Sequence, residues 1–287
     1  YSSVRFKSSD NFLKDGDGSG STSYKATNPV LGLTYHANDS LNVYANYGRG
    51  FESPTLAEVA YKGAATPAFN TSINASKSKH YEIGAKWLPN ATSRLDMTLF
   101  QINSTDEIVV ASNTGGNSTF KNAPGTKRTG WELSGNTLLM PNLRATLAAS
   151  QTNARFSQSF VTGSNNIDAG NKIPGIPQSF VFSELLWTSK AMSDSAANRN
   201  IASKIGAQAG VELTHAGRLY ANDTNTATAD GYNTLALKAS YGWAIGSGVL
   251  TASARVDNAT DKRYIGSVIV NQAASQFYEP APGRNWT

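Results

Sequence analysis

The sequence predicts an all-β protein whose strands form an antiparallel up-and-down transmembrane β-barrel. Three observations support this prediction. Stretches of about ten residues alternate apolar and polar side chains, which is the pattern of a strand with two different faces. Short turns and long polar loops alternate between these stretches, as they do in outer-membrane barrels. Charged residues make up only 16% of the 287 residues, well below the roughly 25% of an ordinary soluble domain.

The two-faced stretches recur along the whole chain, and each is about as long as a tilted strand that crosses a bilayer. In the stretch 203–214, Ile205, Ala207, Val211 and Leu213 share one face, while polar and small residues occupy the other. The predicted strands are 1–7, 30–36, 41–48, 78–88, 93–102, 127–138, 143–153, 177–187, 203–214, 231–243 and 249–257, with a last one beginning near 283. The sequence therefore predicts about twelve strands.

The connections between these strands fall into two sets, and this difference favours a barrel. The short turns are 37–40, 89–92, 139–142 and 244–248, with 188–202 as a longer member of the set. The long polar loops are 8–23, 51–76, 111–126, 155–176, 215–230 and 259–283. Trp87, Tyr241 and Trp243 lie beside short turns, where an aromatic girdle at a membrane interface is expected. A soluble sandwich would mix its loop lengths and carry a charged face.

Charge and cysteine content exclude several classes of protein. The net charge of +5 comes from basic residues that are scattered along the chain, which argues against a nucleic-acid surface. The charge fits a solvated face, or attraction for anionic ligands and lipid head groups. The chain contains no cysteine, so it has neither disulfides nor thiolate metal sites. No stretch approaches 18 apolar residues, so no transmembrane helix is expected.

No motif in the chain predicts catalysis or a resident metal. The sequence shows no Ser/His/Asp order and no nucleophile elbow, so we expect no enzyme. His36, His80 and His215 lack the spacing of metal ligands, and DGDGSG at 15–20 lacks the glutamate that completes a calcium loop. The GRG tripeptide at 48–50 follows a two-faced strand and lacks the Lys-Ser/Thr pair of a phosphate loop. We expect its glycines to let a strand emerge at the barrel rim.

Several segments that follow one another in order carry a specific resemblance. They are NVYANYGRGFESPTLAE at 42–58, KSKHYEIGAKW at 77–87, FKNAPGTKRTGWELSGN at 120–136, IPGIPQ at 173–178, VDNATDKRYIGS at 256–267 and APGRNW at 281–286. Together these segments resemble the TonB-dependent outer-membrane receptors. The matched positions are Tyr81, Glu82, Gly84, Asn122, Thr129, Gly130, Glu132, Asn258, Asp261, Tyr264, Pro282, Gly283 and Arg284.

The resemblance implies a barrel of about 22 strands filled by an N-terminal plug. We expect residues 1–287 to be the C-terminal portion of such a barrel, with the plug domain and the TonB box absent from this chain. The implied function is energy-coupled uptake of a ferric siderophore in the outer membrane of a Gram-negative bacterium. Its partners would be the TonB complex, reached through the plug, the ferric siderophore and outer-membrane lipid, with no nucleic acid. Iron would arrive already chelated, so the protein needs no cofactor and no metal ligands.

Two other classes remain open from the sequence. One is the twelve-strand translocator barrel of an autotransporter, or another outer-membrane channel; a translocator would close on itself and carry a helix before its first strand. The other is a soluble β-rich carbohydrate-binding module. The sequence does not name the siderophore, nor does it separate a siderophore from haem or cobalamin as the substrate, because loops vary independently of the scaffold that carries them.

Candidate site residues follow from the chemistry of an anionic, partly aromatic ferric complex, which favours Arg and Lys for charge and aromatic rings for stacking. The predicted ligand contacts are Arg49, Phe51, Tyr61, Lys62, Phe69, Arg155, Arg218, Tyr220 and Arg263. The predicted contacts with the lumen or plug are Arg49, Glu52, Glu82 and Glu132. The residues predicted to face lipid are Tyr81, Ile83, Trp87, Leu133, Leu235, Leu237 and Tyr241.

Overall fold

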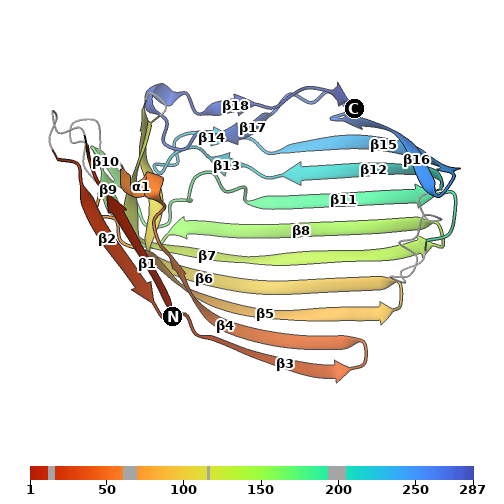
Figure 1. The fold of residues 1–287 in the computed structure, drawn as a ribbon, viewed down its shortest axis with the longest axis horizontal. Helices are drawn as coiled ribbons and strands as arrows, with labels where there is room; N and C mark the ends of the chain where they lie inside the picture. Colours follow the sequence, from red (N-terminus) through yellow and green to blue (C-terminus); the bar gives the residue numbers. More distant parts are fainter. Residues whose placement is uncertain (12–16, 61–69, 115–116, 193–204) are drawn as a thin grey trace.

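A single antiparallel sheet dominates the fold (Figure 1). The computed structural model describes residues 1–11, 17–60, 70–114, 117–192 and 205–287. Eleven strands pair in the order β19-β16-β15-β12-β11-β8-β7-β6-β5-β4-β3, so that strands adjacent in the sequence are neighbours in the sheet, apart from the short hairpins that lie outside it. This topology confirms the predicted all-β, up-and-down fold class.

The strands of the main sheet are β3 (Val30–Asn38), β4 (Leu41–Glu52), β5 (Ser76–Asn90), β6 (Ser93–Thr114), β7 (Asn117–Met140), β8 (Leu143–Phe156), β11 (Ser179–Thr188), β12 (Gly206–Ala216), β15 (Tyr232–Ile245), β16 (Gly248–Asp257) and β19 (Asn285–Trp286). Short turns join them at one end of the sheet and long connections at the other, on the right and left of Figure 1. We call these the turn end and the loop end.

The connections predicted as long polar loops contain short secondary-structure elements of their own. Within the described residues they carry four two-stranded hairpins and two short helices. These elements are β1 (Ser2–Ser8) with β2 (Gly20–Ala26), β9 (Phe160–Thr162) with β10 (Asn165–Ile167), β13 (Leu219–Tyr220) with β14 (Thr228–Ala229), β17 (Ile265–Val268) with β18 (Tyr278–Pro280), the helix α1 (Leu56–Ala60) and the 3-10 helix η4 (Ala273–Ser275). Among the described residues, the predicted first strand pairs with β2 rather than with the main sheet.

The hairpin of β6 and β7 extends far beyond the predicted strands. The pairing continues from Ser93↔Thr137 at the turn end to Thr114↔Asn117 at the loop end, although the sequence predicted a loop over 111–126. The ladder continues because it is made of backbone N–H and C=O groups, which every residue here except proline supplies. Polar Ser, Thr and Asn side chains therefore do not interrupt it. The result is a two-stranded arm that extends beyond the rest of the sheet at the loop end.

Cross-strand register sorts the side chains of the main sheet into two faces. The apolar face contains Leu33, Ala45, Ile83, Leu99 and Trp131, which stand opposite one another on successive strands. All seven residues predicted to face lipid lie on this face, and Tyr81, Ile83, Trp87, Leu237 and Tyr241 are exposed. The polar face contains the alternate positions, such as Glu82 and Thr98.

Buried apolar residues gather at the loop end rather than under the sheet. Ala123, Ala154, Phe156, Ile167 and Ile173 form a hydrophobic cluster there. It packs the strands β7 and β8 against β10 and the segment after it, so it holds the loop end together. Within the described part of the chain, no helix is long and apolar enough to cross a membrane.

Candidate functional site

The polar face carries a hydrogen-bonded centre around Tyr44. The Tyr44 hydroxyl donates to Glu82 Oε1 at 2.7 Å and lies 2.8 Å from Thr98 Oγ1. Gly84 stands opposite Tyr44 in the ladder, and a Cβ at this glycine would come within 2.6 Å of the Tyr44 ring. The matched Tyr81-Glu82-x-Gly84 motif therefore uses its glutamate and its glycine to hold one tyrosine against the strand.

A second polar cluster crosses four strands, and the sequence analysis missed it. Lys238 Nζ lies 2.7 Å from Glu212 Oε1 and 3.2 Å from Glu184 Oε2. Arg255 donates to both oxygens of Glu212, at 3.1 and 2.8 Å, and also contacts Asp257 at 2.7 Å. These residues alternate with apolar ones in their strands, which was the available signal. Only the pairing register of the four strands brings these charged side chains together.

Above these clusters, the polar face is hollowed by a cavity of about 330 Å³. Its lining includes Phe51, Glu52 and His80, together with an ion pair between Arg128 and Glu107. Thr126 donates a further hydrogen bond to the Glu107 carboxylate. The predicted residue Glu52 therefore lies at this cavity and shares its face with the predicted Glu82 and Glu132. Phe51 borders the cavity, but the register places it on the apolar face with Arg49.

Asparagine side chains join the connections at the loop end. Asn171 Nδ2 donates to the carbonyl of Asp223 at 3.0 Å. Asn225 exchanges two hydrogen bonds with the backbone of Lys172, at 2.6 and 2.9 Å. Asn271 accepts from the amide of Asp223 and donates to the carbonyl of Val110 at 2.8 Å. Three of the long connections and the β6–β7 arm are thereby held in one block.

This block encloses a polar cavity of about 510 Å³, with Ser112, Thr162, Asn222 and Asn271 among its lining residues. The side chain of Asp223 is only 3% exposed. Among the described residues, neither of its carboxylate oxygens has a hydrogen-bond partner, and the same holds for Oε1 of Gln272, which also lines the cavity. These buried acceptors suit a ligand that presents hydroxyl or amide hydrogens.

The electrostatics of this cavity centre on one carboxylate and one ammonium. Lys121 Nζ lies 3.7 Å from Asp223 Oδ2, hydrogen-bonds Thr162 and stands 4.5 Å from the centre of the Phe160 ring. Burial raises the pKa of Asp223, and the charge of Lys121 offsets part of that rise. Burial likewise lowers the pKa of Lys121, against the pull of Asp223. Both charges are therefore held in a poorly solvated place.

The other predicted ligand contacts are scattered over the loop end. Tyr220 is half-buried in β13, and its carbonyl accepts from Gly175 at 2.8 Å. Arg218 and Arg263 are exposed, and Arg218 lies 3.6 Å from Asp230. Tyr61, Lys62 and Phe69 lie outside the described residues. The structure does not gather the described members of this set into one pocket.

Two arginines among the predicted contacts face away from the polar face. Arg49 lies two residues after Tyr47 in the strand, so it shares the apolar face with Tyr47 and Ala45. The predicted lumen contacts lie on the other face of the sheet. Arg155 pairs with Lys127 and shares that face. The expectation that Arg49 points into the lumen needs correction, because residues one apart in a strand face opposite ways. Ligand contact by these arginines stays a prediction that their placement does not favour.

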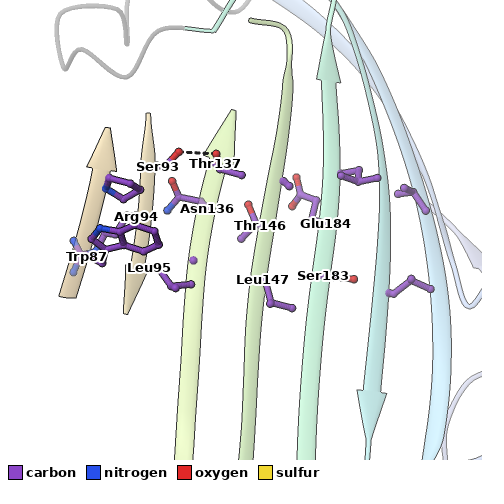
Figure 2. A pocket seen from close by; sticks show the side chains of 16 residues that line it. Trp87, Ser93, Arg94, Leu95, Asn136, Thr137, Thr146, Leu147, Ser183 and Glu184 are labelled. Carbon is purple, nitrogen blue, oxygen red and sulfur yellow. Dashed lines mark hydrogen bonds between the residues drawn. The ribbon is translucent and has the colours of Figure 1, made fainter. Parts of the chain in front are cut away.

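The apolar face also has a groove of about 540 Å³ near the turn end (Figure 2). Small residues, Gly135 and Ser183, leave space between the larger Trp87, Leu95 and Leu147. At its upper edge in Figure 2, Ser93 hydrogen-bonds Thr137 at 2.6 Å. Its walls are mostly apolar, so it suits a hydrocarbon chain rather than a polar ligand.

These features define part of a transmembrane β-barrel, with one apolar and one polar face, and comparison with known proteins identifies its family. The family described as TonB dependent receptor-like, beta-barrel matches residues 1–259, so the chain belongs to this family. Its members are outer-membrane proteins of Gram-negative bacteria, and they are transporters rather than enzymes. The translocator and carbohydrate-binding alternatives therefore do not hold for this chain.

Solved structures share the fold at low sequence identity. The ferric preacinetobactin receptor BauA from Acinetobacter baumannii is 16% identical with a TM-score of 0.65, over 99% of this chain and 38% of BauA. The ferric yersiniabactin uptake receptor FyuA from Yersinia pestis is 19% identical with a TM-score of 0.63, over 94% of this chain and 37% of FyuA. The copper transporter OprC is 16% identical with a TM-score of 0.70, over 99% of this chain and 42% of OprC. The chain thus spans about two-fifths of their length.

Proposed function

We propose that the receptor to which this chain belongs takes up a ferric siderophore, with energy supplied through the TonB complex and a plug domain. The proposal treats residues 1–287 as the C-terminal portion of the barrel. Two structural neighbours, BauA and FyuA, are receptors for ferric siderophores. The neighbour OprC transports copper, so a bare metal ion is the competing substrate.

The observation that carries the proposal is the loop-end cavity, whose buried acceptors on Asp223 and Gln272 make no hydrogen bond among the described residues. An organic chelate brings hydroxyl and amide hydrogens that Asp223 and Gln272 could accept, whereas a bare metal ion needs several ligating side chains. In the described part of the chain, no group of three or more His, Asp or Glu side chains is placed to hold a metal. Arg218, Tyr220 and Arg263 remain proposed contacts at the mouth of the loops, and Glu52, Glu82 and Glu132 remain proposed contacts of the lumen with the plug.

The test is ligand binding by the full-length receptor, measured by quenching of tryptophan fluorescence. The ligands are ferric complexes of a catecholate, a hydroxamate and a carboxylate siderophore, with copper(II) chloride alongside. We expect one ferric complex to bind, and Asp223→Ala to weaken it by about tenfold, the effect of losing a charge-assisted hydrogen bond.

The matched control is Asp230→Ala, because Asp230 is an exposed loop aspartate whose side chain is 87% accessible. This variant should bind as the unchanged receptor does. Binding of copper alone, with no response to any ferric complex, would overturn the proposal. Equal losses in both variants would show that the cavity is not the site.

A further inference from the structure

A row of cations crosses the apolar face just below the loop end. The ladder pairs Arg49 with Lys79, Lys79 with Asn103, Asn103 with Lys127, and Lys127 with Arg155. An isolated bridge then pairs Arg155 with Lys172. Cross-strand partners share a face, so these side chains stand in one line across neighbouring strands. We call Arg49, Lys79, Lys127, Arg155 and Lys172 the basic row.

Among the described residues, no carboxylate forms an ion pair with the basic row. Its hydrogen bonds go to neutral groups: Arg49 donates to the Tyr47 hydroxyl at 3.2 Å, while Arg155 and Lys172 both donate to Asn153 Oδ1, at 2.8 and 2.7 Å. None of the ion pairs found among the described residues includes a member of the row. Burial, together with the charge of Arg155, lowers the pKa of Lys172.

Several other cations of the sheet do have a counter-charge. Arg94, Arg128, Lys238 and Arg255 each have a carboxylate within 4 Å. The ladder position immediately above the row adds a further exposed cation, Lys77, between Phe51 and Thr105. Parallel, unpaired positive charges repel one another, so the row is suited to an anion that several members contact at once.

The side chains beneath the row follow the order of a membrane surface. The next position toward the turn end holds Tyr47 and Tyr81, whose ring centres are 5.2 Å apart, followed across the sheet by Gln101, Thr129 and Asn153. The position below that holds Leu33, Ile83 and Leu99. From the turn end toward the loop end, apolar residues are followed by tyrosines and amides, and these by cations. This is the order expected from the hydrocarbon core through the membrane interface to charged head groups.

We propose that the basic row binds the phosphate groups of a phosphorylated glycolipid in the outer leaflet, whose acyl chains lie against the apolar positions beneath. Arginine forks match phosphate oxygens in pairs, and lysines add point charges. The proposal concerns the outside of the barrel and does not depend on which substrate the receptor transports. It also gives Arg49 and Arg155 a role that agrees with the face they occupy.

The test uses the full-length receptor in nanodiscs of phosphatidylcholine doped with lipid A, a diphosphorylated glycolipid, and counts bound lipid A by native mass spectrometry. The row variant is Arg49→Gln with Lys79→Gln and Lys127→Gln. The control removes the same charge elsewhere, by Lys86→Gln, Lys190→Gln and Lys262→Gln. We expect the row variant to lose about tenfold in affinity for lipid A and the control to stay within about twofold.

Further arms separate the possible anions. Lipid A from which the phosphates have been removed should bind the unchanged receptor and the row variant alike, and a charge-preserving variant, Arg49→Lys with Lys79→Arg and Lys127→Arg, should retain binding. Single Gln variants repeat the measurement if the triple variant yields no folded receptor. Equal lipid A binding by unchanged receptor and row variants would overturn the proposal. Inorganic phosphate displacing lipid A at equal concentration would instead assign the row to a free anion and overturn the lipid assignment.

Discussion

The guanidinium of Arg128 on β7 contacts both oxygens of the Glu107 carboxylate on β6, although twenty-one positions separate the two residues in the sequence. Nη1 donates to Oε2 at 2.7 Å, and Nη2 donates to Oε1. The pair forms one wall of the cavity that contains Glu52. It therefore connects the β6–β7 arm to the polar face of the sheet.

Glu107→Gln should lower the free energy of unfolding by about 1–3 kcal/mol, because it leaves a largely buried guanidinium without its counter-charge. The side chains of Arg128 and Glu107 are 22% and 15% exposed, so solvent screens the pair only in part. Thermal unfolding of the full receptor in detergent measures the effect. Asp96→Asn is the control, since its partner Arg94 is 52% exposed, and it should cost under about 1 kcal/mol. Similar losses in both variants would contradict the prediction.

Gly84→Ala should destabilise the sheet by about 1–3 kcal/mol through overpacking. The new Cβ would lie 2.6 Å from the Tyr44 ring and 2.7 Å from the carbonyl oxygen of Met97. The backbone atom cannot move aside, and Tyr44 is held by Glu82 and Thr98. Gly48→Ala is the matched control, because its Cβ would meet only a Val30 methyl at 3.7 Å. A melting temperature unchanged by Gly84→Ala would refute this packing argument.

Glu212→Gln should cost about 2–4 kcal/mol, because one carboxylate serves both Lys238 and Arg255 and its loss leaves two cations side by side. The Glu212 side chain is 11% exposed. The control is Asp39→Asn, at an exposed residue of the turn end with no ion pair among the described contacts, and it should be nearly neutral. Chemical unfolding of reconstituted receptor compares the two. An Asp39→Asn loss as large as that of Glu212→Gln would count against the bridging role.

Asp223 should make loop-end stability depend on pH. Burial raises its pKa in the folded state, so the folded protein holds this proton to higher pH than the unfolded chain, whose ordinary value is 3.8. Stability is then greatest below that value and falls as pH rises through the raised pKa. Asp223→Asn removes this dependence, so the unchanged receptor should gain stability relative to Asp223→Asn on going from pH 7 to pH 4.

Limited proteolysis of the loops at a series of pH values measures this difference, with Asp230→Asn as the control that keeps the dependence. Protection of the unchanged receptor that falls relative to Asp223→Asn on acidification would have the wrong sign and would exclude Asp223 as the source.

The alternation of apolar and polar side chains along the sequence by itself determines much of this fold. The stretches from Tyr81 to Trp87 and from Leu235 to Trp243 establish strands with one apolar and one polar face, and the alternating lengths of the connections establish their up-and-down order. Both are local properties of the chain, since a strand's period and a turn's length need no distant partner. The motifs that follow one another in order along the chain indicated the family.

The contacts that depend on strand register and on loop packing were decided only by the tertiary structure. The shared carboxylate of Glu212, the pair of Arg128 with Glu107 and the basic row each join residues from different strands, and no single stretch reveals which residues stand opposite one another. Arg49 shows why register matters: successive residues of a strand face opposite ways, so Arg49 lies on the apolar face while Glu52 lines the cavity of the polar face. The loop-end cavity depends on Asn171, Asn225 and Asn271 bridging distant connections. Such long-range hydrogen bonds leave no periodic trace in the sequence.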